Sequence, residues 1–298
     1  MEGGRAGWDA DGPPFTQVGG TVSDDRQDTP AADHPASPPT AADFDKGFAS
    51  VAKSPGLRRV WQQASPDLPP EIEPYSFLSV ALLRHVGDAL ALAPGQTLVD
   101  LGCGRGGPGL WLARSEGALL VGVDFSAVAV QQAAERAALF GLADRARFVV
   151  GELAATGLPD ATADAVVSID AMHFAADPTA AAREALRLLR PGGRLALTNW
   201  QARNLGDSQL PSRMRIDWAE TLRLVGFAEV AVASRPEWHQ RFTRVFQVAL
   251  ERGDPGDDAG LASLQDEARR ALPVAHLVDR VVVTAACPGR QGEAVADG

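Results

Sequence analysis

The chain has 298 residues, of which 45% are hydrophobic and 22% charged, and it carries a formal net charge of −10. This balance argues against a nucleic-acid partner, which needs clustered Lys and Arg, and no apolar run reaches the roughly 18 residues of a membrane helix. The two cysteines and five histidines are scattered at spacings unlike those of metal ligands, so we expect no metal site and a reduced, cytoplasmic, soluble protein.

The N-terminal residues are rich in Gly, Pro, Asp, Ser and Thr and show no hydrophobic period, which is typical of a disordered tail. They also lack the basic start and apolar core of a signal peptide. The remaining length suffices for one α/β domain with a large core. The predicted organisation is a tail at 1–43, a helical lid at 44–93, a catalytic core at 94–288 that includes a helical insertion at 238–273, and a second tail at 289–298.

Apolar runs and helical patterns alternate along the chain. Apolar residues at helical spacing predict a helix over residues 73–92, which ends at a Pro-Gly pair. The strands expected after it are 96–101, 119–124, 147–151, 164–169, 194–199, 229–233 and 280–285. The helices expected between them are 108–116, 126–140, 179–190, 218–226, 240–252 and 258–272. This alternation is typical of right-handed crossovers in a doubly wound α/β fold with helices on both faces of the sheet.

A cluster of glycines follows the first predicted strand: Gly102, Gly104, Gly106, Gly107 and Gly109. Glycine permits positive φ and close approach of a ligand, so the cluster predicts a small-molecule site at the end of that strand. Its spacing, with Asp124 about twenty residues later, satisfies the dinucleotide-binding fingerprint. Asp100 favours a different ligand, because a carboxylate just before the turn would repel a pyrophosphate and attract a cation. S-adenosylmethionine has a sulfonium, an ammonium and a ribose diol, and no phosphate.

Three segments carry a family resemblance. They are Asp100-Leu101-Gly102-Cys103-Gly104-Arg105-Gly106, Val121-Gly122-Val123-Asp124-Phe125-Ser126 and Leu189-Arg190-Pro191-Gly192-Gly193. Residues 98 to about 200 thereby resemble the class I S-adenosylmethionine-dependent methyltransferases, in the branch that acts on ubiquinone precursors and natural products. The resemblance implies a Rossmann-like sheet of seven strands with the last strand antiparallel, and an N-terminal helical lid. The two helices before the last strand would then be an insertion that shapes a substrate pocket.

The resemblance also implies which residues bind the cofactor. Asp100 would face the ammonium group, and Asp124 would accept hydrogen bonds from both ribose hydroxyls, although an acid at a helix N-terminus is the alternative. Phe125 would lie against the adenine or in the core. Glu152 stands where the family usually has an aspartate for the adenine amino group. The predicted cofactor set is Tyr75, Asp100, Gly102, Cys103, Gly104, Asp124, Phe125, Glu152, Leu153 and Ile169.

Catalytic and substrate residues are predicted from the same resemblance. Methyl transfer from a sulfonium needs mainly alignment of the reacting atoms, and a base only where the acceptor keeps its proton. The family often has a histidine at the position of His173, which we predict as a general base, with packing inside its loop as the alternative. Asp170 would orient this histidine or contact the methionine amine. The aromatic residues predicted to bind substrate, with core packing as the alternative, are Trp61, Trp200, Trp238 and His239.

The sequence therefore predicts a methyltransferase that uses S-adenosylmethionine, forms S-adenosylhomocysteine and acts as a monomer or homodimer. The expected acceptor is a small molecule, preferably a hydroxyl of a natural product or secondary metabolite, with nitrogen and carbon acceptors open. Two alternatives remain. One is a protein that binds S-adenosylmethionine on the same fold without methyl transfer, such as a cyclase. The other is an NAD-dependent oxidoreductase that uses the overlapping glycine fingerprint.

Overall fold

The computed structural model describes residues 40–73 and 76–289, and within them the chain forms a mixed sheet of seven strands. The strands are β1 (Thr97–Leu101), β2 (Leu119–Asp124), β3 (Ala146–Val150), β4 (Ala163–Ile169), β5 (Leu189–Ala202), β6 (Ala228–Ser234) and β7 (Val278–Ala286). Their order across the sheet is β3-β2-β1-β4-β5-β7-β6. The pairs among β1 to β5 are parallel, while β7 runs antiparallel to both β5 and β6. The predicted fold class is confirmed.

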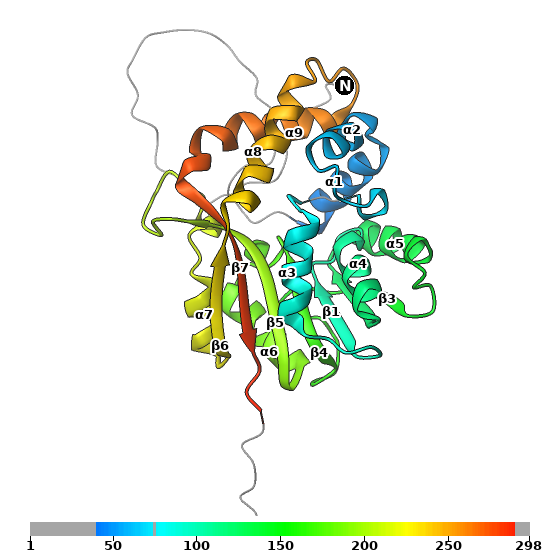
Figure 1. Cartoon of the computed structure of the whole chain (residues 1–298), viewed down its shortest axis with the longest axis vertical. Coiled ribbons are helices and arrows are strands. Elements are labelled where there is room, and N and C mark those ends of the chain that lie inside the picture. The colour runs from blue at the N-terminus through cyan, green and yellow to red at the C-terminus, as the bar shows by residue number, and fades with distance from the viewer. Residues whose placement is uncertain (1–39, 74–75, 290–298) are drawn as a thin grey trace, which may run out of the picture.

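Helices cover both faces of this sheet (Figure 1). On one face lie α3 (Val80–Leu90) and α4 (Gly107–Glu116), and on the other lie α6 (Pro178–Leu188) and α7 (Trp218–Val225), while α5 (Ala127–Arg136) packs against β2 and β3. Successive strand residues supply the two cores, because neighbouring side chains of a strand point to opposite faces. Leu98 of β1 belongs to the first core, and Val99 to the second.

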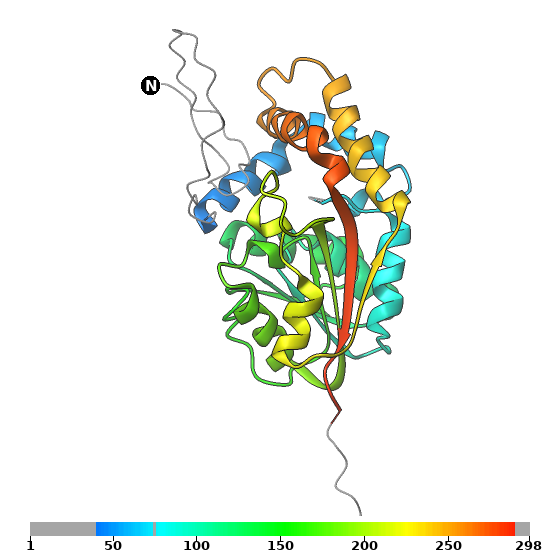
Figure 2. The same ribbon diagram turned by 90° about the vertical axis from the view of Figure 1, so that its left-hand side faces the viewer.

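Four helices form a cap over one end of the sheet (Figures 1 and 2). They are α1 (Ala41–Lys53), α2 (Pro55–Ala64), α8 (Pro236–Glu251) and α9 (Ala259–Ala271). Asp258 joins the two chain segments of this cap: it accepts hydrogen bonds from the Leu261 N–H at 3.0 Å, which caps α9, and from the Gly56 N–H at 2.7 Å in α2. The predicted lid and the predicted insertion therefore pack together.

Several boundaries differ from those expected. Helix α1 begins at Ala41, inside the stretch predicted as a tail, of which residues 1–39 lie outside the described residues. The helix predicted from residue 73 begins only at Val80, because Ser79 caps it by accepting a hydrogen bond from the Leu82 N–H at 3.1 Å. Strand β5 is longer than expected, since antiparallel pairing with β7 continues to Ala202. Within residues 40–73 and 76–289, no helix has the length and apolarity to cross a membrane.

Candidate active site

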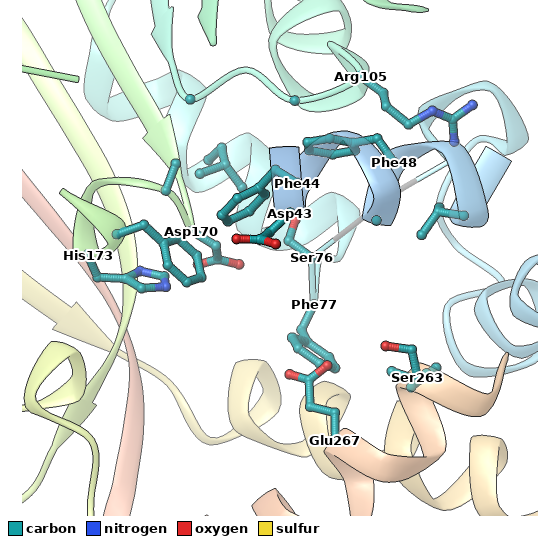
Figure 3. A pocket seen from close by; sticks show the side chains of 18 of the residues that line it. Asp43, Phe44, Phe48, Ser76, Phe77, Arg105, Asp170, His173, Ser263 and Glu267 are labelled. Atoms are coloured by element: carbon teal, nitrogen blue, oxygen red, sulfur yellow. The ribbon is translucent and has the colours of Figure 1, made fainter. Parts of the chain in front are cut away.

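A cavity of about 1530 Å³ lies between the carboxyl ends of the parallel strands and the cap. Ligand pockets usually measure about 300–1,000 Å³, so this one has room for a cofactor and a second molecule. Its walls come from the glycine loop after β1, the ends of β2 and β4, the start of α1 and the inner side of α9 (Figure 3). The predicted glycine-loop site is thus one end of a larger space.

The glycine loop is held open by its backbone and by Asp124. Gly102 and Gly104 have φ values of 71° and 50°, and a Cβ on Gly102 would lie 2.2 Å from the Cβ of Ala171. Asp124 accepts hydrogen bonds from the Gly104 N–H at 2.8 Å and the Ser126 N–H at 2.9 Å. A carboxylate has about four lone-pair positions, so Asp124 can fix the loop and still accept bonds from a ligand diol.

Asp100 is a buried carboxyl beside this loop. Its exposed fraction is 2%, and its Oδ1 has no hydrogen-bond partner among the described residues. A Cβ on Gly109 would lie 2.2 Å from Oδ2, so glycine is required there. Burial, and next the nearby charge of Asp124, raise the pKa of Asp100 to about 7. A cation bound here would relieve both effects, which fits the ammonium group of S-adenosylmethionine.

The other predicted cofactor residues lie on the cavity wall, with one exception. Cys103, Phe125, Glu152, Leu153 and Ile169 all line the cavity. Tyr75 lies outside the described residues.

Helix α1 contributes aromatic residues that we did not predict. Phe44 packs edge-on against Phe125, with ring centroids 5.1 Å apart, and against Phe174 at 5.3 Å. Phe48 lies 3.3 Å from the position of a Cβ on Gly104. Helix α1 therefore covers the cofactor end of the cavity. The N-terminal position of these residues, before any motif, gave no signal for this role.

His173 lines the cavity beside Phe174. Burial, and next the positive charge of Arg213, lower the pKa of His173 to about 3, and its Nδ1 has no hydrogen-bond partner among the described residues. The imidazole is therefore neutral at pH 7. His173 lies on the wall of the cavity in which a general base would act, and its predicted role as that base stays a prediction.

Asp170 is held by side chains of the sheet, and among the described residues no hydrogen bond joins it to His173. The Thr198 hydroxyl donates to its Oδ1 at 2.8 Å, and the fully buried Arg280 of β7 donates to its Oδ2 at 2.8 Å and also to Oδ1. Asp170 lines the cavity with a φ of 54°, a left-handed conformation that is costly for a residue with a Cβ. Its two predicted roles, orienting His173 and contacting the methionine amine, stay predictions.

Two of the four predicted substrate residues line the cavity. Trp61 and Trp200 face it on either side of Phe77, with ring centroids 5.6 and 5.9 Å from the Phe77 ring. Phe242 of α8 completes this aromatic wall, 4.1 Å from Trp200. We call the part of the cavity bounded by Trp61, Phe77, Trp200 and Phe242 the aromatic chamber.

Trp238 and His239, which are also predicted to bind substrate, are not among the residues that line the cavity, and the His239 ring lies behind the wall beside Trp200, with centroids 6.0 Å apart. The sequence predicts both residues between a strand that ends at residue 233 and a helix that begins at residue 240. Helix α8 instead begins at Pro236, so they belong to its first turn. Trp238 is 2% exposed and packs against His85 of α3, with ring centroids 5.1 Å apart.

Helix α9 adds polar groups to the cavity that the sequence did not single out. Ser263 and Glu267 are one helical turn apart, and Figure 3 shows both pointing from α9 into the cavity. The predicted insertion pointed to this region of the chain. No motif in it indicated which face of the helix would line a site.

Comparison with known proteins gives a family match for the central part of the chain. Residues 99–197 match a family model described as a methyltransferase domain. The 27-O-demethylrifamycin SV methyltransferase of Amycolatopsis mediterranei is 36% identical over 160 residues, which cover 53% of this chain and 56% of that protein. The 2-methyl-6-phytyl-1,4-hydroquinone methyltransferase of Synechocystis is 36% identical over 132 residues, covering 44% and 40%. The chain thus spans about half the length of the curated relatives it matches.

Solved structures share the fold over most of the chain. The cyclase SpnF has a TM-score of 0.59 and 27% identity, covering 70% of this chain and 81% of its own. A methyltransferase from Geobacter sulfurreducens in complex with S-adenosylhomocysteine has a TM-score of 0.56 and 21% identity, covering 76% and 97%. The second likeness shows the fold.

Proposed function

We propose, from the membership of residues 99–197 in the class I S-adenosylmethionine-dependent methyltransferase family, that this chain transfers a methyl group from S-adenosylmethionine to a small-molecule acceptor. The observation that carries the proposal is the single cavity that unites the glycine loop with the aromatic chamber. A methyl transferase needs both parts within reach of each other, because its rate depends on bringing acceptor and methyl group into line.

The cofactor end of the cavity fits S-adenosylmethionine. Asp124 would hold the ribose hydroxyls, and the unpartnered Oδ1 of Asp100 would face the ammonium group. Phe125 would lie on the adenine, with Glu152 and Leu153 at its edge. When bound, the cofactor supplies an electrophilic methyl group on a sulfonium. A pyrophosphate would meet the charge of these carboxylates instead, which disfavours the oxidoreductase alternative.

The aromatic chamber supports an acceptor with a largely apolar body. Four aromatic side chains enclose it, and aromatic walls bind flat apolar groups well. Two relatives of the chain are named as methyltransferases of 27-O-demethylrifamycin SV and of 2-methyl-6-phytyl-1,4-hydroquinone. We propose a natural-product hydroxyl as the methylated group. The lid at 44–93 and the insertion at 238–273 would close around it over the core at 94–288.

A second candidate is a cyclase without methyl transfer, which the likeness to SpnF favours. Two experiments separate the possibilities. In calorimetry, we expect S-adenosylhomocysteine to bind and NADH not to bind. With methyl-labelled S-adenosylmethionine and a panel of hydroxylated polyketides and hydroquinones, we expect label in an acceptor. Cofactor binding without transfer to any acceptor would favour the cyclase, and binding of NADH alone would overturn both.

A matched pair of variants tests the cofactor end. Hydrogen bonds to a charged group contribute roughly 1.5–3 kcal/mol, so Asp124→Asn should weaken S-adenosylhomocysteine binding at least about tenfold. Asp144→Asn, at an exposed position, should leave it unchanged. Equal affinities of the two variants would contradict the assignment of Asp124.

A further inference from the structure

Glu267 of α9 is a carboxyl in the cavity wall that the cofactor end does not use. It points from α9 into the space below α1, where Asp43, Phe44 and Phe48 lie (Figure 3). No hydrogen bond or salt bridge formed among the described residues engages its carboxylate. Glu267 is half-buried and lines the cavity, so a ligand that enters the cavity can bond its unengaged carboxylate.

The surroundings of Glu267 define what that ligand is. Ser263, one turn earlier on α9, points into the same space (Figure 3). Phe77, Trp200 and Phe242 supply the apolar side. Burial raises the pKa of Glu267 to about 7, while the positive charges of Arg213 and Arg270 oppose this rise.

The charges around Glu267 favour a neutral donor. Arg213 and Arg270 both line the same cavity, and they would repel a cationic group that approached the carboxylate. A hydroxyl meets no such repulsion, donates a hydrogen bond to a carboxylate and accepts one from a serine.

We propose that Glu267 and Ser263 bind a hydroxyl group of an otherwise apolar acceptor, and thereby determine which acceptors the aromatic chamber takes. The inference rests on the proposed function. Both residues lie outside residues 99–197, which match the methyltransferase-domain model, so they belong to a part of the chain where acceptor specificity can differ while the cofactor site stays the same. A site built to bond a hydroxyl discriminates strongly against an analogue that lacks it.

A pair of probes tests the proposal without requiring turnover. 2-Naphthol and 2-methylnaphthalene have the same size, and only the first carries a hydroxyl. Their affinities for the full chain are to be measured by calorimetry, with and without S-adenosylhomocysteine. We expect wild type to prefer 2-naphthol about tenfold, the equivalent of one hydrogen bond to a charged group.

The variants separate recognition from folding. Glu267→Leu should abolish the preference for 2-naphthol while keeping the affinity for 2-methylnaphthalene and for S-adenosylhomocysteine. Ser263→Ala, a milder change, should reduce the preference about threefold. Glu251→Leu, at an exposed position on α8, should retain the wild-type preference.

The outcomes are distinct. Equal binding of the two probes by wild type, or a preference that survives Glu267→Leu, would overturn the inference. Retained probe preference without S-adenosylhomocysteine binding would contradict the proposed function and leave the role of Glu267 standing.

Discussion

Asp100 links the charge state of the site to cofactor binding. In the free protein its pKa is raised to about 7, and a bound ammonium group would favour the ionised carboxylate. Binding should therefore release a proton below pH 7. The Asp100 carboxyl of the free protein is mostly protonated at pH 6 and mostly ionised at pH 8. The affinity for S-adenosylhomocysteine should therefore rise about tenfold over this range, because at pH 8 binding no longer has to remove the proton. Calorimetry across this range checks the prediction.

Asp100→Asn is the control for this titration. It should bind S-adenosylhomocysteine more weakly, because a neutral amide attracts the ammonium less. Its affinity should also be nearly constant over the same range. A tenfold rise that persists in Asp100→Asn would show that another group titrates.

The sequence predicts the residues at strand ends well and those on helices poorly. Asp100 and Asp124 follow from the apolar runs that place them at the carboxyl edge of a parallel sheet. The direction of the Trp238 side chain depends on where α8 begins. Because this helix begins at Pro236, two residues after β6 ends, Trp238 belongs to the helix and not to the connection before it. Glu267 was missed because only tertiary packing decides that its side of α9 faces a cavity and not solvent.

Helix α1 packs against α5 and α9, and two kinds of contact hold it at the α5 side, over the cofactor end. Phe44 packs on Phe125, and Asp45 accepts hydrogen bonds from the Ser126 hydroxyl and from the Val128 N–H at 3.4 Å. The bonds of Asp45 join α1 to the first turn of α5. A cover held by a few such contacts can open to exchange ligands.

Removing the polar contact should speed ligand release. Asp45→Ala leaves the cavity wall intact but removes hydrogen bonds that hold α1 closed. We expect the dissociation rate of S-adenosylhomocysteine to rise about tenfold, which corresponds to a loss of roughly 1.4 kcal/mol in the free energy that favours the closed position of α1. Stopped-flow displacement measures this rate. Lys53→Ala, in the exposed last turn of α1, is the control and should not change it. An unchanged rate in Asp45→Ala would mean that α1 does not limit release.

Most elements agree with the sequence to within a few residues, because caps and glycines mark their ends. Ser126 begins α5 by accepting a hydrogen bond from the Ala129 N–H at 3.1 Å, as expected of a serine at that position. Strand β5 is the main exception. It begins at Leu189, which pairs with Ala163 of β4, and regular pairing with β4 and β7 starts at Arg194, so the Pro-Gly-Gly stretch between them is an irregularity within the strand.

At the scale of the whole molecule, the site lies between two parts built from different segments of the chain. The sheet and its flanking helices form the cofactor end, while the cap joins a segment before the sheet to one between β6 and β7. Asp258 and the close approach of α2 and α9 hold the cap together: a Cβ on Gly260 would lie 2.6 Å from the Cβ of Ser54. Helices α2 and α9 lie far apart in the sequence, so their contact produces no local sequence pattern. The sequence therefore predicts both segments of the cap but not that they touch.

A ligand bound between the two parts should stabilise them together. Saturation with S-adenosylhomocysteine at about 100 times its dissociation constant adds about 2.7 kcal/mol to the free energy of unfolding. For a domain of this size, that corresponds to a rise in melting temperature of roughly 5–10 °C.

Hydrogen exchange measured by mass spectrometry should show which segments the bound S-adenosylhomocysteine protects. We expect slower exchange in the glycine loop after β1, at the end of β2 and in α1, whose Phe44 and Phe48 line the cavity. Helix α7 and strand β6 lie at the far edge of the sheet and should exchange at unchanged rates. Protection of the loop without α1 would show that the ligand binds the core alone and that α1 stays open above it.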